Sequence, residues 1–295
     1  MNNQKYIRTD LASECAAIDA CTSLPGISQT ETHTDFGEIS IINILDKNGE
    51  KLLNKPIGRY VTVSFQNILS LSEETSDSLI STVSEHIRSF TRRLVPKKQK
   101  LTVLIVGLGN RYITSDAVGP LTVNNITVTR HIKEKNSKIF ELLGQQTVAA
   151  VAPGVLGQTG IETVEIIKGA VDTVKPDIVI VIDALAAKDV SRLAATIQIS
   201  DTGISPGSGI GNNREALNAE TLGVPVVALG VPTMVSSATL VYNALEKAGI
   251  TQISGELTKV LDEGVSFFVT LNETDAVVNS LSHILAESIN KAFSI

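Results

Sequence analysis

Aromatic side chains and cysteine are both scarce in this sequence. Tryptophan is absent, and aromatic residues make up only 4% of the 295 positions. The core must therefore be built mainly from Val, Ile, Leu and Ala, the residues that fill buried parallel strands. The two cysteines, Cys15 and Cys21, form no CxxC motif. A disulfide framework and a Cys–His catalytic set are not indicated, and a reducing cytosol is the default compartment.

The sequence also lacks long apolar runs and an excess of basic residues. No apolar run is long enough to cross a bilayer, and the N-terminal residues contain no apolar core of a secretory signal. The formal net charge is −6, which argues against a partner held by its phosphates. The basic residues between positions 92 and 100 are better explained as a solvated helix end and loop. We therefore expect a soluble intracellular protein without a membrane or direct nucleic-acid partner.

Apolar periodicity predicts the main elements. Strands are expected at residues 39–45, 60–65, 101–106, 178–182 and 224–229. Helices are expected at residues 73–94, 120–135, 160–174 and 275–293, the first of them starting after Ser72. The sequence Lys47-Asn48-Gly49 is interpreted as a turn between the first two strands, within an N-terminal hairpin portion at 36–70.

Strands that alternate with helices are typical of a parallel sheet with right-handed crossovers. The sequence therefore predicts an α/β fold with a mixed, mostly parallel central sheet flanked by helices. No repeat, low-complexity tract or linker divides the chain after residue 100. We expect one domain spanning residues 13–295, preceded by a separate polar segment at 1–12.

Two acidic residues are candidates for catalysis. Asp183 follows the predicted strand at 178–182 directly, and Asp116 lies in the loop after the strand at 101–106. Sites in open α/β sheets form at the carboxyl ends of the strands, so both side chains are expected at one edge. An isolated Asp at a strand end is also a common helix cap or loop brace. Two neighbouring carboxylates favour hydrolysis, because their pKa values separate and one can activate water while the other donates a proton.

Loops rich in Gly and Pro surround these acids in the sequence. The residues Gly107-Leu108-Gly109-Asn110 lack the third Gly and the later acid of a dinucleotide-binding fingerprint. Further segments of this kind lie at 152–160, 202–212 and 230–233, and all three are expected in loops. They are as consistent with plain turns as with binding loops. The candidate substrate-binding or loop-supporting residues are Gly107, Gly109, Asn110, Pro153, Gly154, Gly207, Ser208 and Gly209.

The same segments resemble the spore germination protease family. The similarity covers residues 101 to 240 and is carried by an ordered set of motifs: VGLGN, TSDAVGP, APGVLGQTGIET, KPDIVIVIDALAAKDVSRLAATIQISDTGISPGSGIGNNR and ETLGVPVVALGVPT. The resemblance implies an endopeptidase that initiates degradation of small acid-soluble spore proteins in the forespore or spore core. It also implies a fold similar to hydrogenase-maturation proteases (a phosphorylase/hydrolase-like fold), a homotetramer, and an atypical aspartic mechanism whose two candidate aspartates fall on Asp116 and Asp183.

The resemblance also implies a zymogen. Family members remove a short propeptide at a site that mimics their substrates, and Thr9-Asp10-Leu11-Ala12-Ser13-Glu14 fits that pattern. We therefore expect cleavage between Ala12 and Ser13 in an exposed, flexible tail, where proteolysis is easiest.

The sequence departs from the family's usual pattern at two positions. Ser115 stands where the family often has Pro, and Ser236 stands where it often has Asp. The chain is also shorter than many members. These departures leave Asp116 and Asp183 unaffected and bear instead on the fit of the substrate and the contacts of the oligomer.

Two other functions stay open at this point. The related maturation proteases hold a metal with two acids and a His, whereas the four histidines here are scattered and His131 lies nearest to the motifs. No metal and no cofactor are expected, although a metal-dependent protease is an alternative. A non-catalytic protein that binds peptides through its Gly-rich loops is another.

Overall fold

The computed structural model describes residues 8–16, 24–207, 214–250, 254–263 and 267–294. Its centre is a nine-stranded sheet in the order β1-β2-β3-β7-β8-β6-β4-β5, with β9 paired to β8. The strands are β1 (Ile27–His33), β2 (Gly37–Ile44), β3 (Gly58–Phe65), β4 (Thr102–Gly107), β5 (Thr147–Val151), β6 (Ile178–Ala186), β7 (Thr196–Ser200), β8 (Val226–Ser236) and β9 (Phe268–Val269).

The sheet has a parallel part and an antiparallel part. Strands β8, β6, β4 and β5 are parallel neighbours, whereas β1, β2, β3 and β7 continue the sheet beyond β8 in antiparallel register. The expected mixed sheet flanked by helices is confirmed. Its antiparallel part is larger than the sequence indicated, because β7 inserts between β8 and the β1–β3 meander.

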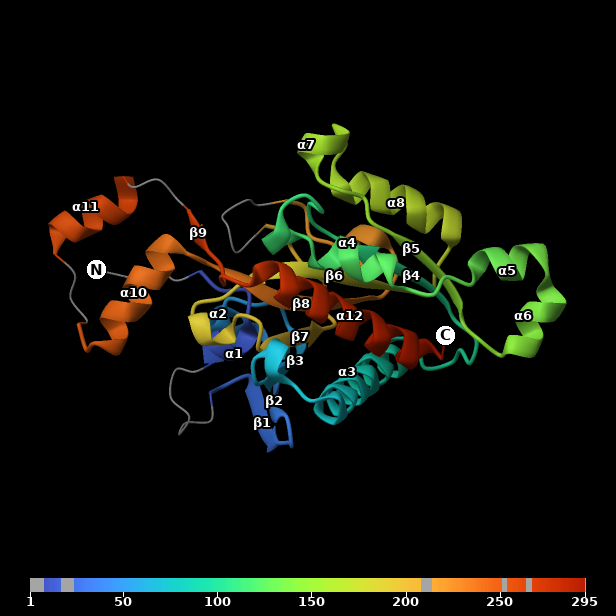
Figure 1. Ribbon diagram of the computed structural model, residues 1–295, viewed down its shortest axis with the longest axis horizontal. Coiled ribbons are helices and arrows are strands. Elements are labelled where there is room, and N and C mark those ends of the chain that lie inside the picture. The colour runs from blue at the N-terminus through green and yellow to red at the C-terminus, as the bar shows by residue number, and fades with distance from the viewer. Residues whose placement is uncertain (1–7, 17–23, 208–213, 251–253, 264–266, 295) are drawn as a thin grey trace.

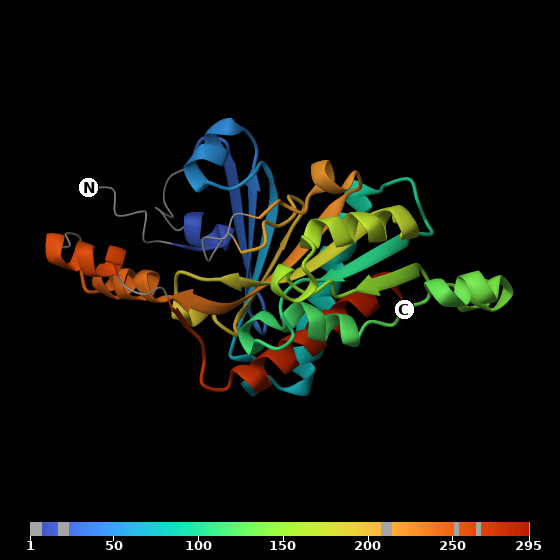
Figure 2. The ribbon, with the colours of Figure 1, turned by 90° about the horizontal axis from the view of Figure 1, so that it is seen from above.

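Helices cover both faces of the parallel strands. Figures 1 and 2 show α3 (Glu73–Leu94), α4 (Val118–Asn124) and α12 (Thr274–Phe293) together on one face and α8 (Thr163–Val174) on the other. Alternate residues of a strand point to opposite faces. Accordingly Val103 and Ile105 of β4 pack in the core with α3 and α12, whereas Leu104 and Val106 pack in a second core with α8. This double burial is the reason that these strands are continuous aliphatic runs.

The remaining helices are shorter or lie away from the sheet. They are α1 (Ala12–Ala16), α2 (Lys47–Leu53), α5 (Arg130–Lys135), α6 (Ser137–Leu143), α7 (Leu156–Thr159), α9 (Ala219–Leu222), α10 (Ser237–Lys247) and α11 (Gly255–Glu263). Helices α5 and α6 project from one end of the molecule and α10 and α11 from the other (Figure 1). Among the described residues, no helix has the length and apolar character needed to cross a membrane.

Several expectations about elements are confirmed. The strands at 39–45, 60–65, 101–106 and 178–182 are present as β2, β3, β4 and β6, and the strand at 224–229 is the first part of β8. Helix α3 spans Glu73–Leu94, and Ser72 caps it by accepting a hydrogen bond from the Thr75 amide. Helix α12 follows the prediction to within one residue.

Other expectations were wrong. The predicted turn at Lys47-Asn48-Gly49 is the first turn of α2, because the Asp46 side chain accepts from the Asn48 and Gly49 amides and starts a helix. The single helix expected at 120–135 is divided into α4 and α5. The Gly- and Pro-containing residues 230–233 lie inside strand β8, where a loop was expected, and the segment at 152–160 contains the short helix α7.

Candidate functional site

Asp183 lies within strand β6, not after it. The strand continues to Ala186, and Asp183 pairs in parallel register with Gly230 of β8. The preceding residue, Ile182, pairs with Gly107 at the end of β4. The Asp183 side chain is only 6% exposed, and its Oδ1 accepts a hydrogen bond from the Ala184 amide at 2.9 Å. The fold therefore holds a carboxyl group in the sheet at the edge where β4 ends.

Asp116 reaches the same edge from a short 3-10 helix, η3 (Thr114–Asp116), in the loop after β4. Its Oδ2 accepts a hydrogen bond from the Asn110 amide at 2.7 Å. Strand β8 supports the loop as well, because Thr233 Oγ1 donates to the Ser115 carbonyl at 2.6 Å. The position of Asp116 is thus set by a bond to Asn110 near the start of its loop and by the bond between Ser115 and strand β8.

Two glycines make this arrangement possible. Gly109 has a φ of +111°, and a Cβ atom there would lie 2.0 Å from the Asp116 carbonyl oxygen. A Cβ on Gly107 would lie 2.2 Å from the Gly119 carbonyl oxygen of α4. Since neither position has room for a side chain, the glycines let the loop fold back over the strand end. Both were expected to support the site.

A pocket of about 100 Å³ brings the two acids together. Its lining residues are Asp10, Leu108, Gly109, Asp116, Gly154, Val155, Thr163, Asp183, Ala184, Leu185, Ala186, Ser205, Pro206, Gly207, Arg214 and Met234. The candidates Gly109, Gly154 and Gly207 are among these lining residues.

The remaining loop candidates lie around this pocket or outside the described part of the chain. Pro153 is buried beside Gly154. Asn110 braces the loop: its side-chain oxygen accepts from the Gln158 side chain at 2.6 Å and from the Tyr112 amide at 3.0 Å. Ser208 and Gly209 lie outside the described residues.

The pocket perturbs its two acids unequally. Burial raises the pKa of Asp183 well above its ordinary value, and the nearby Asp116 and Asp10 carboxylates raise it further. Burial also raises the pKa of Asp116, but the hydrogen bond from the Asn110 amide and the positive charge of Arg214 oppose that shift. The surroundings of Asp183 therefore disfavour its charged form more strongly than those of Asp116 do.

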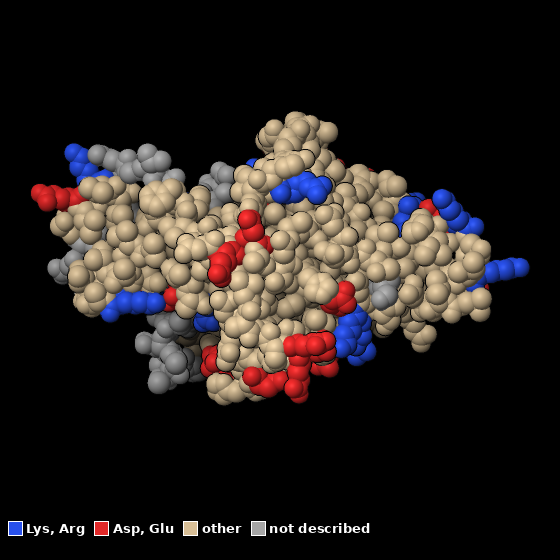
Figure 3. Space-filling model, in the orientation of Figure 1, with Lys and Arg blue, Asp and Glu red and all other residues tan. Residues whose placement is uncertain are grey.

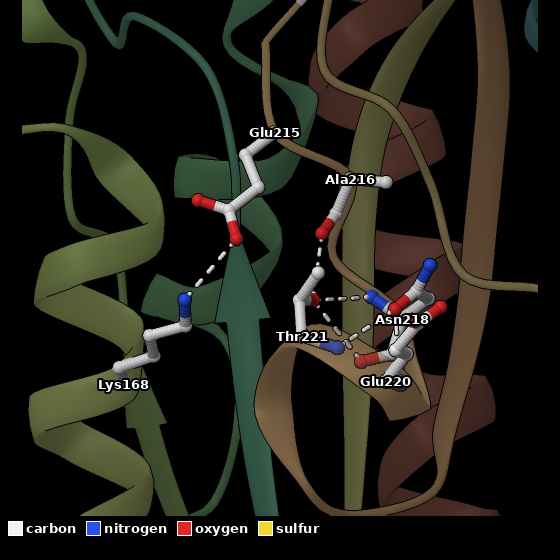
Figure 4. A network of polar contacts seen from close by, with 6 residues as sticks. All are labelled: Lys168, Glu215, Ala216, Asn218, Glu220 and Thr221. Carbon is white, nitrogen blue, oxygen red and sulfur yellow. Dashed lines mark hydrogen bonds and ion pairs between the residues drawn. The ribbon is translucent and has the colours of Figure 1, made fainter.

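Sequence reasoning missed two charged residues of the pocket, Asp10 and Arg214. Figure 4 shows how the residues after Arg214 are anchored: Glu215 pairs with Lys168 of α8 at 3.1 Å, and the Ala216 carbonyl accepts from Thr221 at 2.7 Å. Leu217 then forms a β-bridge with Ile204. Arg214 ends the motif ISPGSGIGNNR, which was noted for its Gly and Pro residues and for the family resemblance, so its charge was an available but unused signal.

The expected cleavage residues, Ala12 and Ser13, follow Asp10, which lines this pocket, and they do not lie in an exposed tail. Leu11 and Ala12 are fully buried, and Ala12 begins helix α1, so the Ala12–Ser13 bond lies in a helical turn. The exposed-tail expectation was therefore wrong for residues 9–12, because the apolar side chains of Leu11 and Ala12 pack against the protein, whereas Arg8 is exposed. Residues 1–7 lie outside the described part.

No metal centre is evident in the described part of the chain, where no group of three or more His, Cys, Asp or Glu side chains is arranged to hold an ion. The face drawn in Figure 3 carries small separate groups of basic and acidic residues and no continuous basic stripe.

The fold and the pocket define an α/β protein in which a buried acid, Asp183, and a partly buried acid, Asp116, meet at the carboxyl end of the parallel strands. Comparison with known proteins agrees with this class. The family model for germination protease matches residues 9–247. A germination protease of Caldanaerobacter subterraneus is 40% identical over 97% of this chain and 94% of its own length. That of Clostridium perfringens is 38% identical over 97% and 94%, and that of Bacillus subtilis is 44% identical over 83% and 67%.

The chain therefore belongs to the germination protease family and is a hydrolase that cleaves proteins in spore germination. A structural comparison also matched the [NiFe] hydrogenase maturation protease HycI of Thermococcus kodakarensis. That match has 17% identity and a TM-score of 0.36, and it covers 70% of this chain and 99% of the other. The α/β class itself follows from the strand order and does not depend on this match.

Proposed function

We propose that the chain is an atypical aspartic endopeptidase in which Asp116 and Asp183 activate water against a peptide bond. The observation that supports this most directly is the shared pocket. It holds the Asp116 and Asp183 carboxyl groups, which come from the loop after β4 and from strand β6, with the pKa of Asp183 raised further than that of Asp116.

The unequal environments suggest a division of roles. Asp183 acts as the acid and Asp116 as the base, because burial and the Asp116 and Asp10 carboxylates raise the pKa of Asp183 further than burial raises that of Asp116. The pair titrates as one coupled unit, so the assignment describes its dominant singly protonated state.

Hydrolysis then proceeds in two steps, the addition of water and the breakage of the C–N bond. Asp116 takes a proton from water as the water oxygen bonds to the carbonyl carbon, and Asp183 gives its proton to the carbonyl oxygen. The tetrahedral intermediate collapses when the C–N bond breaks. The proton held by Asp116 passes to the leaving amine, and the carbonyl proton returns to Asp183.

The substrates and the zymogen are part of the same proposal. By family resemblance, the substrates are small acid-soluble spore proteins of the forespore or spore core, and the active form is a homotetramer. Self-cleavage between Ala12 and Ser13 removes residues 1–12 from the peptidase domain at 13–295. Because that bond lies in helix α1, at least the first turn of the helix must unwind before cleavage.

Intact mass spectrometry over time tests the proposal. Purified wild-type protein should lose residues 1–12, whereas Asp116→Asn and Asp183→Asn should stay full length. Asp172→Asn is the matched control, since Asp172 is an exposed acid on α8 and should not affect cleavage.

Two outcomes would contradict the mechanism. Self-cleavage at the wild-type rate in both active-site variants would remove Asp116 and Asp183 from the chemistry. Cleavage that stops on addition of a chelator and returns with a divalent metal would favour the metal-dependent alternative.

A further inference from the structure

The chain's own segment Thr9–Glu14 occupies a site beside the carboxylate pocket. The Asp10 amide donates to the Ala186 carbonyl at 2.9 Å, and the Ala186 amide donates to Asp10 Oδ2 at 2.9 Å. Asp10 also lines the pocket that holds Asp116 and Asp183. A peptide held in this way lies next to the acids, as a substrate must.

Gln198 of β7 binds the main chain of this segment. Its Oε1 accepts from the Ala12 amide at 2.7 Å, and its Nε2 donates to the Asp10 carbonyl at 3.1 Å. The side chain is buried, so these contacts are shielded from water. Because they involve only backbone atoms, they fix the register of the peptide whatever its side chains are.

Two separate apolar sites hold the side chains of Leu11 and Ala12. Leu11 is buried in a cluster with Leu185, Ala187, Leu193 and Val235. Ala12 is buried in another cluster that includes Ile42, Ile44, Leu53 and Tyr60. The first site takes a branched aliphatic side chain. The second holds only a methyl group, and a larger residue there would overpack it.

The carboxylate of Glu14 is bound by two backbone amides. Its Oε2 accepts from the Lys188 amide at 2.7 Å, and its Oε1 accepts from the Asp189 amide at 2.8 Å. Such bonds between N–H groups and an ionised carboxylate are stronger than neutral ones. The loop after β6 is therefore shaped for an acidic residue three positions after the aliphatic one.

We propose that these residues are the specificity subsites of the protease. Gln198, the Leu11 site, the Ala12 site and the amide pair of Lys188 and Asp189 would bind an acidic peptide segment of the pattern aliphatic–Ala–any–Glu from another protein. The chain's own segment Thr9–Glu14 occupies the same subsites until another peptide displaces it. The inference rests on the proposed function, since it assumes that a peptide bound here is hydrolysed.

Displacement of the chain's own segment by an added peptide tests whether both bind the same site, and this test does not depend on catalysis. Freshly purified full-length protein is mixed with a synthetic peptide of residues 5–18, and hydrogen exchange is measured at the Asp10 and Ala12 amides of the protein. Millimolar peptide is needed, because a tethered segment competes at an effective concentration of about 1 mM. The peptide should speed exchange at both amides, and a peptide carrying Leu11→Asp and Glu14→Gln should not.

Kinetics on the self-processed protein test the role of Gln198. Gln198→Met removes both main-chain contacts at similar length, so the KM for the peptide should rise about tenfold while kcat stays within about twofold. Gln146→Met is the matched control. Gln146 also bonds two backbone groups, the Leu101 amide and the Gln99 carbonyl, but at the far end of β4.

Different experimental outcomes would contradict the proposed peptidase function and the proposed subsites. Displacement of the segment without any hydrolysis would leave the subsites standing and contradict the proposed function. Hydrolysis with an unchanged KM in Gln198→Met, and no displacement by the peptide, would overturn the subsites while the peptidase activity stands.

Discussion

Asp183 combines deep burial with negatively charged neighbours. Ionising a carboxyl group in such a place costs free energy, because desolvation and the nearby Asp116 and Asp10 carboxylates all oppose the charge. An unfolded chain would expose the same group to water at its ordinary pKa. The protonation of this one residue therefore couples folding stability to pH.

The sign of that coupling gives a prediction for Asp183→Asn. Since the folded pKa is raised, the native state binds more protons than the unfolded state between the ordinary pKa and the raised one. Wild-type stability should therefore fall as pH increases through that window. Asparagine keeps the shape and the acceptor without the charge, so the variant should have a higher Tm at pH 7 and nearly the wild-type Tm at pH 4. Each kcal/mol gained corresponds to roughly 2–4 °C for a protein of this size.

Thermal unfolding across pH, followed by circular dichroism, checks this effect. Asp172→Asn, which removes an exposed carboxylate, should leave the pH profile unchanged. A variant Tm below wild type at pH 7, or equal to it at every pH, would show that Asp183 is not destabilised by its charge.

At the scale of single residues, the sequence located Asp116 and Asp183 at one edge of the sheet but did not locate Asp10 and Arg214 beside them. Asp116 and Asp183 follow aliphatic runs, and the end of a buried strand can be located from such a run. The residues that follow Arg214 are anchored far away in the sequence, because Glu215 pairs with Lys168 and Leu217 bridges to Ile204. Contacts of that kind depend on how loops close, which no local pattern encodes.

At the scale of elements, strand β8 contributes more than expected. It runs from Val226 to Ser236, past the point where Gly230 suggested an end, and places Thr233 against the loop of Asp116. Strand β6 likewise continues past Asp183. Parallel pairing between β6 and β8 offsets the weak strand preference of Gly230 and Pro232, and this tertiary effect exceeds local propensity.

The hydrogen bond from Thr233 to the Ser115 carbonyl leads to a prediction that removing its donor lowers kcat. Thr233→Val keeps the shape but removes the donor, so the loop that carries Asp116 should be held less firmly. We expect kcat for peptide hydrolysis to fall about tenfold, with unfolding free energy reduced by only about 1 kcal/mol.

A comparison with Thr91→Val separates positioning from stability. Thr91 is also buried and donates to a backbone carbonyl, that of Ile87 in α3, away from the pocket. Urea titration and steady-state kinetics on both variants should show a similar loss of stability but a loss of kcat only in Thr233→Val. Equal kcat values in the two variants would mean that the bond to Ser115 does not position Asp116.

Elements differ in how well the sequence predicted them, and length and burial explain the difference. Helices α3 and α12 have 22 and 20 residues and a sustained apolar period, so both were located closely. Strands β5 and β7 have five residues each, and β1 is almost wholly exposed. Short strands carry too few apolar positions for periodicity to detect, and β1 is fixed mainly by pairing with β2.

At the scale of the whole molecule, helices α5 and α6 form an arm with an exposed apolar surface. Leu142 is 87% exposed, and Ile139 and Leu143 of the same helix are each 49% exposed. The arm projects away from the sheet at one end of the molecule (Figure 1). Apolar residues gathered on a projecting helix are typical of surfaces that contact another chain.

This surface leads to a prediction about the proposed homotetramer. If α6 contacts a second copy, Leu142→Asp would place a charge in an apolar interface, and the desolvation cost would oppose assembly. Light scattering at micromolar concentration should then give a four-chain mass for wild type and a smaller mass for the variant. Leu45→Asp is the control, because Leu45 is also exposed, at 63%, but follows strand β2 on another part of the molecule. The same four-chain mass in both variants would place the interface elsewhere, and a single-chain mass for wild type would contradict the tetramer itself.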